Sequence, residues 1–199
     1  VILTPPHSEN PLITGFLAKR KIPFARIGSI ISGPGIAMTM DDEGSARRAT
    51  EHLIALGHSR IGFIAGPKEY DLSNWRIDGW REAMTTAGFS CDALCVRGDF
   101  GYDSGVLAAN ALLDLENPPT AIIGSNDQMT LAALDAAKTR GLNIPGDLSL
   151  ISFDNTPVVR FTMPELTAVD QPIAATFSKA VDLLLTDGDA LVPHQPIVI

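Results

Sequence analysis

Short apolar runs alternate along this chain with amphipathic helical stretches, and no other feature of the sequence constrains the fold so strongly. The runs are apolar at successive positions, as expected for strands that are buried on both faces of a parallel sheet. A strand followed by a helix recurs about every 30 residues, which is the length of a βαβ unit. The candidate strands are 1–4, 24–28, 36–40, 61–65, 94–97, 121–124 and 148–153.

Helical periodicity separates most of these strands. In 44–57 the apolar residues Ala46, Ala49 and Leu53 recur at helical spacing, and Gly57 supplies a stop signal. The last predicted helix has Pro172 in its first turn, where the missing N–H of proline costs nothing. The other predicted helices are 74–88, 126–140 and 172–186.

The alternation predicts an α/β fold with two lobes, each a parallel sheet covered by helices on both faces. Gly57-His58-Ser59 separates a leading block from a trailing block. We therefore expect a partial N-terminal lobe over 1–58 and a C-terminal lobe over 59–155. The chain does not begin with Met and both ends stop inside strand-like runs, so we expect a fragment of a longer protein.

The composition of the chain argues against several classes of function. The chain has 15 Lys and Arg residues against 23 Asp and Glu residues, a net charge of −8, and such a chain is a poor binder of nucleic acid or membrane surfaces by itself. No apolar run is long enough for a transmembrane helix, and no signal peptide is visible. Cys91 and Cys95 are too few for a disulfide framework or a complete zinc site, and we expect both to stay reduced.

Polar residues follow almost every predicted strand. Ligands of open parallel sheets bind at the carboxyl ends of the strands, so these residues are the candidate site. Carboxylates accept hydrogen bonds from vicinal hydroxyls, an Arg fork donates to two oxygens, and an aromatic ring covers the apolar face of a sugar. The set suits a polyhydroxyl ligand and suits a phosphate poorly. The residues are Asp41, Asp42, Trp75, Arg76, Asp99, Phe100, Asn126, Asp127, Asp154 and Asn155.

Each candidate also has a structural interpretation. Asn126 or Asp127 could cap the helix that begins there, as Asp41 or Asp42 could cap the one before. Arg76 could be a solvated residue of a helix start, Asp154 could form a turn, and the spacing of Trp75 favours a core position. His58, after the helix stop at Gly57, is interpreted as solvated or as a capping residue.

The sequence shows no catalytic constellation. It has no G-x-S-x-G elbow, no H-E-x-x-H motif, and no Ser or Cys with a plausible His partner. His7, His52 and His194 share no ligand spacing with Cys or carboxylates. We therefore predict no enzymatic activity, no metal and no cofactor.

Five motifs together resemble the effector-binding core of the LacI/GalR family of bacterial transcriptional regulators, and the resemblance covers essentially the whole chain. They are ATEHLIALGHSRIGFIAGP at 49–67, RIDGWREA at 76–83, PTAIIGSNDQM at 119–129, GLNIPGDLSLISFDN at 141–155 and PELTAVDQP at 164–172.

The resemblance implies a type I periplasmic-binding-protein-like fold, with two Rossmann-like lobes, a ligand cleft between them and an incomplete leading lobe. It assigns 156–199 to the crossover and the return to the N-terminal lobe, with 172–186 as a helix of that lobe. It assigns Asp41 to coupling of the lobes. The implied effector residues are Arg76, Asn126, Asp154 and Gln171, with Asp127 and Phe100 as weaker matches and Trp75 as a further candidate.

The function implied is the sugar-binding and dimerisation core of a cytoplasmic LacI-type regulator. A homodimer would bind operator DNA through an N-terminal helix-turn-helix that this chain lacks, and the effector would control that binding allosterically. The alternatives are a periplasmic sugar-binding protein of a transporter and, more remotely, an α/β enzyme. The sequence names neither the effector nor the operator, nor whether the effector induces or co-represses.

Overall fold

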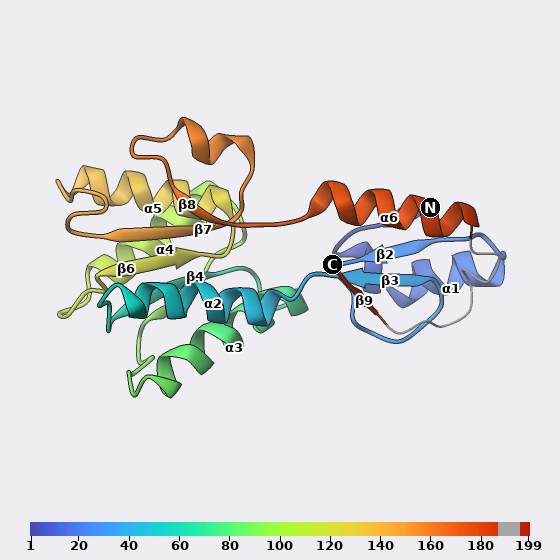
Figure 1. Ribbon diagram of the computed structural model, residues 1–199, viewed down its shortest axis with the longest axis horizontal. Helices are drawn as coiled ribbons and strands as arrows, with labels where there is room; N and C mark the ends of the chain where they lie inside the picture. Colours follow the sequence, from blue (N-terminus) through green and yellow to red (C-terminus); the bar gives the residue numbers. More distant parts are fainter. Residues whose placement is uncertain (187–195) are drawn as a thin grey trace. The chain divides into compact units, whose positions relative to one another are not determined.

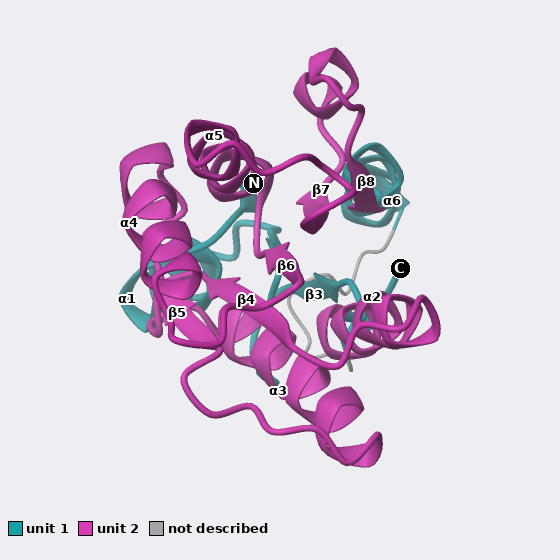
Figure 2. Ribbon diagram, turned by 90° about the vertical axis from the view of Figure 1, so that its left-hand side faces the viewer, with its two compact units in different colours: residues 1–41, 172–199 teal, residues 42–171 magenta. Residues whose placement is uncertain are grey.

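The computed structural model describes residues 1–186 and 196–199. By its internal contacts the chain divides into two compact units (Figure 2). Unit 1 consists of residues 1–41 and 172–199, and unit 2 of residues 42–171. Each unit is built on a parallel sheet with helices against it, as the alternation of strands and helices predicts (Figure 1).

Unit 1 has a four-stranded parallel sheet of order β1-β2-β3-β9. Its core joins Ala25, Ile36 and Met38 of the sheet to Ala180 of the last helix. The first helix is capped by Asn10, whose Oδ1 accepts from the backbone N–H of Leu12 at 3.0 Å. The elements are β1 (Ile2–Leu3), the 3-10 turn η1 (His7–Glu9), α1 (Pro11–Lys19), β2 (Ala25–Ile27), β3 (Ile36–Thr39), α6 (Ile173–Thr186) and β9 (Ile197–Val198).

Unit 2 has a five-stranded parallel sheet of order β5-β4-β6-β7-β8. Helices α2 and α3 pack together on one face, and α4 and α5 pack together on the other (Figure 1). The elements are α2 (Asp42–Ala55), β4 (Ile61–Ala65), α3 (Asp71–Thr86), β5 (Cys95–Arg97), α4 (Tyr102–Leu113), β6 (Ala121–Gly124), α5 (Asp127–Thr139), β7 (Ser149–Asp154), the 3-10 turn η2 (Pro157–Phe161) and β8 (Thr167–Asp170).

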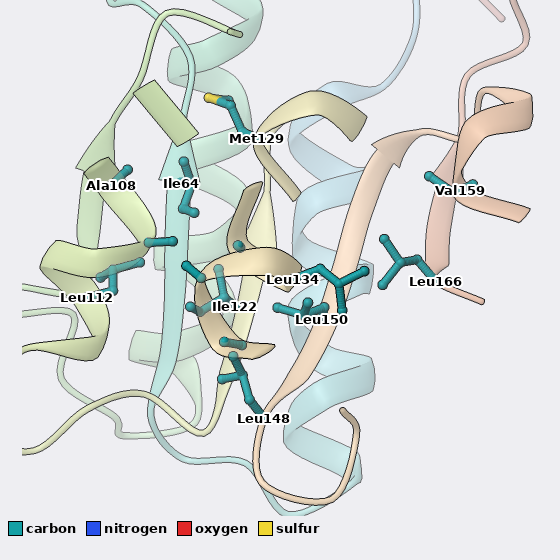
Figure 3. Packing of buried hydrophobic residues seen from close by; sticks show 14 residues of the cluster. Ile64, Ala108, Leu112, Ile122, Met129, Leu134, Leu148, Leu150, Val159 and Leu166 are labelled. Atoms are coloured by element: carbon teal, nitrogen blue, oxygen red, sulfur yellow. The ribbon is translucent and has the colours of Figure 1, made fainter. Parts of the chain in front are cut away.

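One hydrophobic core of unit 2 lies between the sheet and helices α4 and α5. Ile64 and Ile122 of the central strands, Leu112 of α4 and Met129 of α5 are fully buried in it (Figure 3). On the opposite face Trp80 is fully buried, and its indole Nε1 donates to the carbonyl oxygen of Ile61 at 3.1 Å. These contacts fix the central strands, whose carboxyl ends carry the candidate site.

The strand order places a topological switch point in unit 2. The chain runs from β4 to β5 on one side and then returns past β4 to β6 on the other. Ligands of open α/β sheets bind in the crevice beyond the carboxyl ends of the strands at such a point. In unit 2 this crevice begins after Ala65 of β4 and Gly124 of β6.

The boundaries of the two units differ from those predicted. We predicted one lobe over 1–58, a second over 59–155, and a crossover and return to the first lobe over 156–199. The structure divides the chain after Asp41 and after Gln171. The first difference arises because α2 packs along α3 in unit 2. The second arises because β8 pairs with β7, with Thr167 opposite Ile151 and Asp170 opposite Asp154. The 172–186 helix lies in unit 1.

His58 caps the end of α2, as one of its two interpretations predicted, because its backbone N–H donates to the carbonyl oxygen of Leu53 at 3.1 Å. Its half-buried side chain has further partners. Its Nδ1 lies 2.8 Å from Thr120 Oγ1 and its Nε2 lies 3.0 Å from Ser149 Oγ. Thr120 directly precedes β6 and Ser149 begins β7. The imidazole therefore joins the amino ends of the central strands, and sequence spacing gave no sign of partners so far along the chain.

Candidate functional site

Arg76, on the second turn of α3, is the centre of the candidate site. It is only 2% exposed, so it is not a solvated residue of the helix start. Its Nε donates to Asp42 Oδ1 at 2.7 Å, and its Nη1 donates to the carbonyl oxygen of Ser125, directly after β6. Its guanidinium carbon lies 4.4 Å from the ring centroid of Phe153, within the range of a cation–π contact.

Asp154 ends β7 beside this guanidinium. Its φ is +93°, in the left-handed region that non-glycine residues rarely occupy, and such outliers concentrate at ligand sites. Its Oδ1 accepts from Gln171 Nε2 at 2.6 Å. Burial raises the pKa of the Asp154 carboxyl; the charges of Asp127 and Asp42 act in the same direction, whereas Arg76 and the Gln171 hydrogen bond oppose it. The result is a half-buried carboxylate that is a strong hydrogen-bond acceptor.

Asn126 and Asp127 begin α5 next to Asp154. Asn126 is the N-cap: its Oδ1 accepts from the N–H of Met129 at 3.0 Å, and its Nδ2 donates to the carbonyl of Phe100 at 2.8 Å. Asp127 is buried and accepts from Ser152 Oγ and from the N–H and Oγ1 of Thr156. Asn126 thus has the capping role that its position allowed, whereas Asp127 holds the turn that follows Asp154.

Two aromatic side chains, Tyr70 and Phe100, lie near the same strand ends and form an aromatic wall. The Phe100 ring rests on Gly66, where an added Cβ would lie 2.2 Å from Phe100 Cζ. Tyr70 meets Phe100 edge-on at a centroid distance of 5.6 Å. The buried hydroxyl of Ser73 also lies against Gly66 and has no hydrogen-bond partner among the described residues. This corner of unit 2 therefore combines an apolar face with a buried hydroxyl beneath it.

The structure does not bring all predicted residues into this group. Trp75 is half-buried on α3, and Trp80 takes the core position on that helix. Asp41 is exposed and is the last residue of the first segment of unit 1. Gln171, the last residue of unit 2, does belong to the group through its bond to Asp154.

The sequence placed Asp42 among the strand-end candidates, with helix capping as the alternative, but it did not indicate the partner of Asp42, and Arg97 was missed. Asp42 lies 34 positions before its partner Arg76, and no local pattern indicates such a pair. Arg97 ends β5, and it donates to the carbonyl of Gly66 at 2.9 Å and to Asn74 Oδ1 at 2.8 Å. It therefore fastens the β4–α3 loop to the sheet edge. Its place directly after an apolar run was the available signal.

One hollow of unit 2 lies away from these residues. It has a volume of about 430 Å³ between α2 and the edge strand β8, with Ala49, Ile151 and Val169 among its lining residues. None of the predicted site residues lines it. Over residues 1–186 and 196–199, no group of three His, Cys, Asp or Glu side chains could hold a metal ion, and no helix is long and apolar enough to cross a membrane.

The fold and the strand-end cluster define a class that comparison with known proteins identifies. Residues 50–198 match the family described as "Periplasmic binding protein-like domain". The chain is 42% identical over 147 residues to the HTH-type transcriptional repressor CytR of Escherichia coli, covering 73% of this chain and 43% of that protein. It is 37% identical over 171 residues to catabolite control protein A of Priestia megaterium, covering 84% of this chain and 52% of that protein.

Solved structures agree with this class. A regulatory protein of the LacI family from Chloroflexus aggregans superposes with a TM-score of 0.88 at 35% identity, covering 100% of this chain and 72% of that one. The transcriptional regulator CelR in complex with cellobiose superposes with a TM-score of 0.85 at 31% identity, covering 100% of this chain and 62% of that one. The chain therefore belongs to the LacI/GalR family of regulators and carries its periplasmic-binding-protein-like domain. It spans about half the length of the curated relatives it matches.

Proposed function

We propose that this chain is the effector-binding and dimerisation core of a bacterial LacI-type transcriptional regulator, and that its effector is a sugar. The observation that carries the proposal is the cluster of Arg76, Asp154 and Gln171 at the switch point of unit 2. It combines a guanidinium donor, a carboxylate acceptor and an amide, which is the chemistry that recognises vicinal hydroxyls. The likeness to CelR in complex with cellobiose supports a sugar.

The site recognises two parts of a sugar: the hydroxyl groups at the edge of its ring and the apolar C–H face of the ring. The Asp154 carboxylate accepts from ligand hydroxyls, and the guanidinium of Arg76 donates to their oxygens. Phe100 and Tyr70 offer an apolar wall to the C–H face of the ring. Asn126, Asp127 and Trp75 complete the proposed set, and Asp41 couples the site to unit 1. We propose no turnover of the ligand.

The proposed assembly is a homodimer. The 3-10 turn η2 after β7 and the residues that follow it expose Phe161 at 86% and Met163 at 84%, whereas the small residues Ala132, Ala133 and Ala136 of α5 are buried within unit 2. Apolar side chains this exposed are a normal feature of protein interfaces. The dimer would bind operator DNA through an N-terminal helix-turn-helix outside this chain, as the HTH-type names of its relatives suggest.

The sugar would act by shifting an equilibrium. A ligand that binds two conformations with different affinity shifts their populations, and the difference in affinity is the coupling to operator binding. Such a regulator works beside the chromosome, so we assign it to the bacterial cytoplasm.

A thermal-shift screen tests this function. The full-length protein is heated with glucose, galactose, ribose, cellobiose and a phosphorylated form of each monosaccharide. A ligand that binds only the folded state raises Tm, and at a concentration of 100 times Kd it stabilises by about 2.7 kcal/mol. We expect at least one free sugar to raise Tm without being consumed. If no free sugar raises Tm, or if the ligand that does so is converted to a product, the proposal is wrong.

A further inference from the structure

We propose that Asp42 is the positioning residue of the effector site: it fixes the Arg76 guanidinium so that the Nη2 group is directed to the ligand. The inference rests on the proposed function, because it concerns how that site is prepared for a sugar. Asp42 touches Arg76, and it acts on the ligand only through that side chain.

Three separate elements hold the guanidinium. Asp42 at the start of α2 accepts from Nε, the carbonyl of Ser125 at the end of β6 accepts from Nη1, and the Phe153 ring of β7 lies under the guanidinium carbon. A planar group bonded through two of its nitrogens and covered on one face cannot rotate without breaking these contacts. Nη2 is the nitrogen that this set of contacts leaves for a ligand.

Fixing this side chain before the ligand arrives favours binding. Ordering a rotamer-rich side chain on association costs about 0.5–1.5 kcal/mol, and a residue that is already ordered avoids that cost. An exposed ion pair would not provide such order, because it is weak and mobile. The Asp42–Arg76 pair is different, since the side chains are only 6% and 3% exposed.

The position of Asp42 at the start of α2 suits it to this role. The helix macrodipole stabilises a carboxylate in the first turn, which offsets part of the cost of burying it. Glu43 is the next residue of the same turn and is exposed. Replacing Glu43 therefore removes a comparable helix-end charge while leaving Arg76 untouched, which makes it a matched control.

The first test observes Arg76 directly by NMR of arginine side chains in the ligand-free full-length protein. In the parent protein and in Glu43→Gln, the Nε–H of Arg76 should be protected from exchange, with separate signals for its two Nη groups. In Asp42→Asn the protection and the separation should be lost. Unchanged Arg76 signals in folded Asp42→Asn would overturn the proposal whatever the protein binds.

The second test is a double-mutant cycle on sugar affinity, using the free sugars of the thermal-shift panel with cellobiose first. It compares Asp42→Asn, Arg76→Gln and the double variant by calorimetry. We expect Asp42→Asn to weaken binding roughly three- to tenfold, the equivalent of ordering one side chain. The same substitution should add nothing in the Arg76→Gln background, because its effect passes through Arg76. Glu43→Gln should change Kd less than about twofold on the same scale.

The outcomes separate the two proposals. If Arg76→Gln abolishes binding but Asp42→Asn leaves Kd unchanged, the sugar site stands and the positioning role is wrong. An equal effect of Asp42→Asn with and without Arg76 also contradicts it. If no sugar of the panel binds, or if Arg76→Gln binds sugar normally, the proposed function is wrong, and the positioning role of Asp42 is then wrong as well. Should Asp42→Asn not fold, Asp42→Glu keeps the charge, displaces it by one methylene, and must show the same weakening.

Discussion

At its carboxyl end the unit 2 sheet gathers the carboxylates of Asp42, Asp127 and Asp154 around one guanidinium, whereas at its amino end an imidazole lies between two hydroxyl groups. The carboxyl end also has the backbone outlier at Asp154. The amino end pairs uncharged partners and ties neighbouring strands together. One end of the sheet thus concentrates charged side chains, while the other joins its strands through uncharged hydrogen bonds.

The largest effect on the free energy of unfolding is expected when a structural contact at the carboxyl end of the sheet is removed. In Asp127→Ala the buried hydroxyl of Ser152 and the half-buried N–H and hydroxyl of Thr156 lose this carboxylate, and at about 1–3 kcal/mol for each unsatisfied group we expect a loss of roughly 2–4 kcal/mol in the free energy of unfolding. Urea denaturation measures it. Gln128→Ala, an exposed neighbour in the same turn, is the control. A loss no greater than that of the control would mean that Asp127 does not hold this turn.

Asp154→Asn should sharpen the comparison by moving stability and binding in opposite directions. Burial holds the pKa of this carboxyl above its ordinary 3.8, so the folded state is penalised for the charge once the pH rises through that raised pKa. Removing the charge should therefore raise Tm at pH 7, and the gain should fade as the pH falls through the raised pKa and be absent below 3.8. Scanning calorimetry against pH checks this.

The same Asp154→Asn variant should bind sugar at least about tenfold more weakly, the equivalent of 1.4 kcal/mol, because a charged acceptor has become a neutral amide. Asp92→Asn, on an exposed loop, should change neither property. A variant that loses both stability at pH 7 and affinity would mark Asp154 as a structural turn residue instead.

The smallest effect is expected at the amino end. Burial lowers the pKa of His58 from its ordinary 6.5, so the stability that the neutral imidazole contributes is present above pH 6.5 and is lost as the pH falls through the lowered pKa. At pH 8, His58→Gln should lose about 0.5–1.5 kcal/mol of unfolding free energy, the usual value of a hydrogen bond. Its acid sensitivity should also fall, while sugar affinity stays unchanged. His52→Gln, on the exposed side of α2, is the control for urea titrations at pH 8 and below 6.5.

Much of the fold could be predicted because buried parallel strands are apolar throughout. The predicted strands 61–65 and 121–124 coincide with β4 and β6. Helices α1 and α4 were not predicted. Gly15 interrupts the first, and the second mixes buried small residues such as Gly105 and Ala108 with an exposed Leu107, so neither presents a clear apolar stripe. Strand β8 is half-exposed, which hides it from a search for buried runs.

The candidate site was predictable in outline and not in its internal bonds. The rule that ligands bind beyond strand ends points to Arg76 and Asp154 from sequence order alone. The Asp42–Arg76 pair depends on how closely α2 approaches α3, and Gly79 permits that approach: a Cβ there would lie 2.0 Å from the carbonyl oxygen of Glu43. Such a contact between helices has no periodic signature in the sequence.

Calorimetry of the full-length Arg76→Ala variant with the sugar identified by the thermal-shift screen tests the central claim most directly. We expect the affinity to be at least about tenfold weaker, because a charge-assisted hydrogen bond contributes roughly 1.5–3 kcal/mol and 1.4 kcal/mol is a factor of ten in Kd. Lys138→Ala, exposed in the last turn of α5, should bind as the parent does. An Arg76→Ala protein that is folded and binds the sugar with unchanged affinity would contradict the assignment of the effector site to the charged end of this sheet.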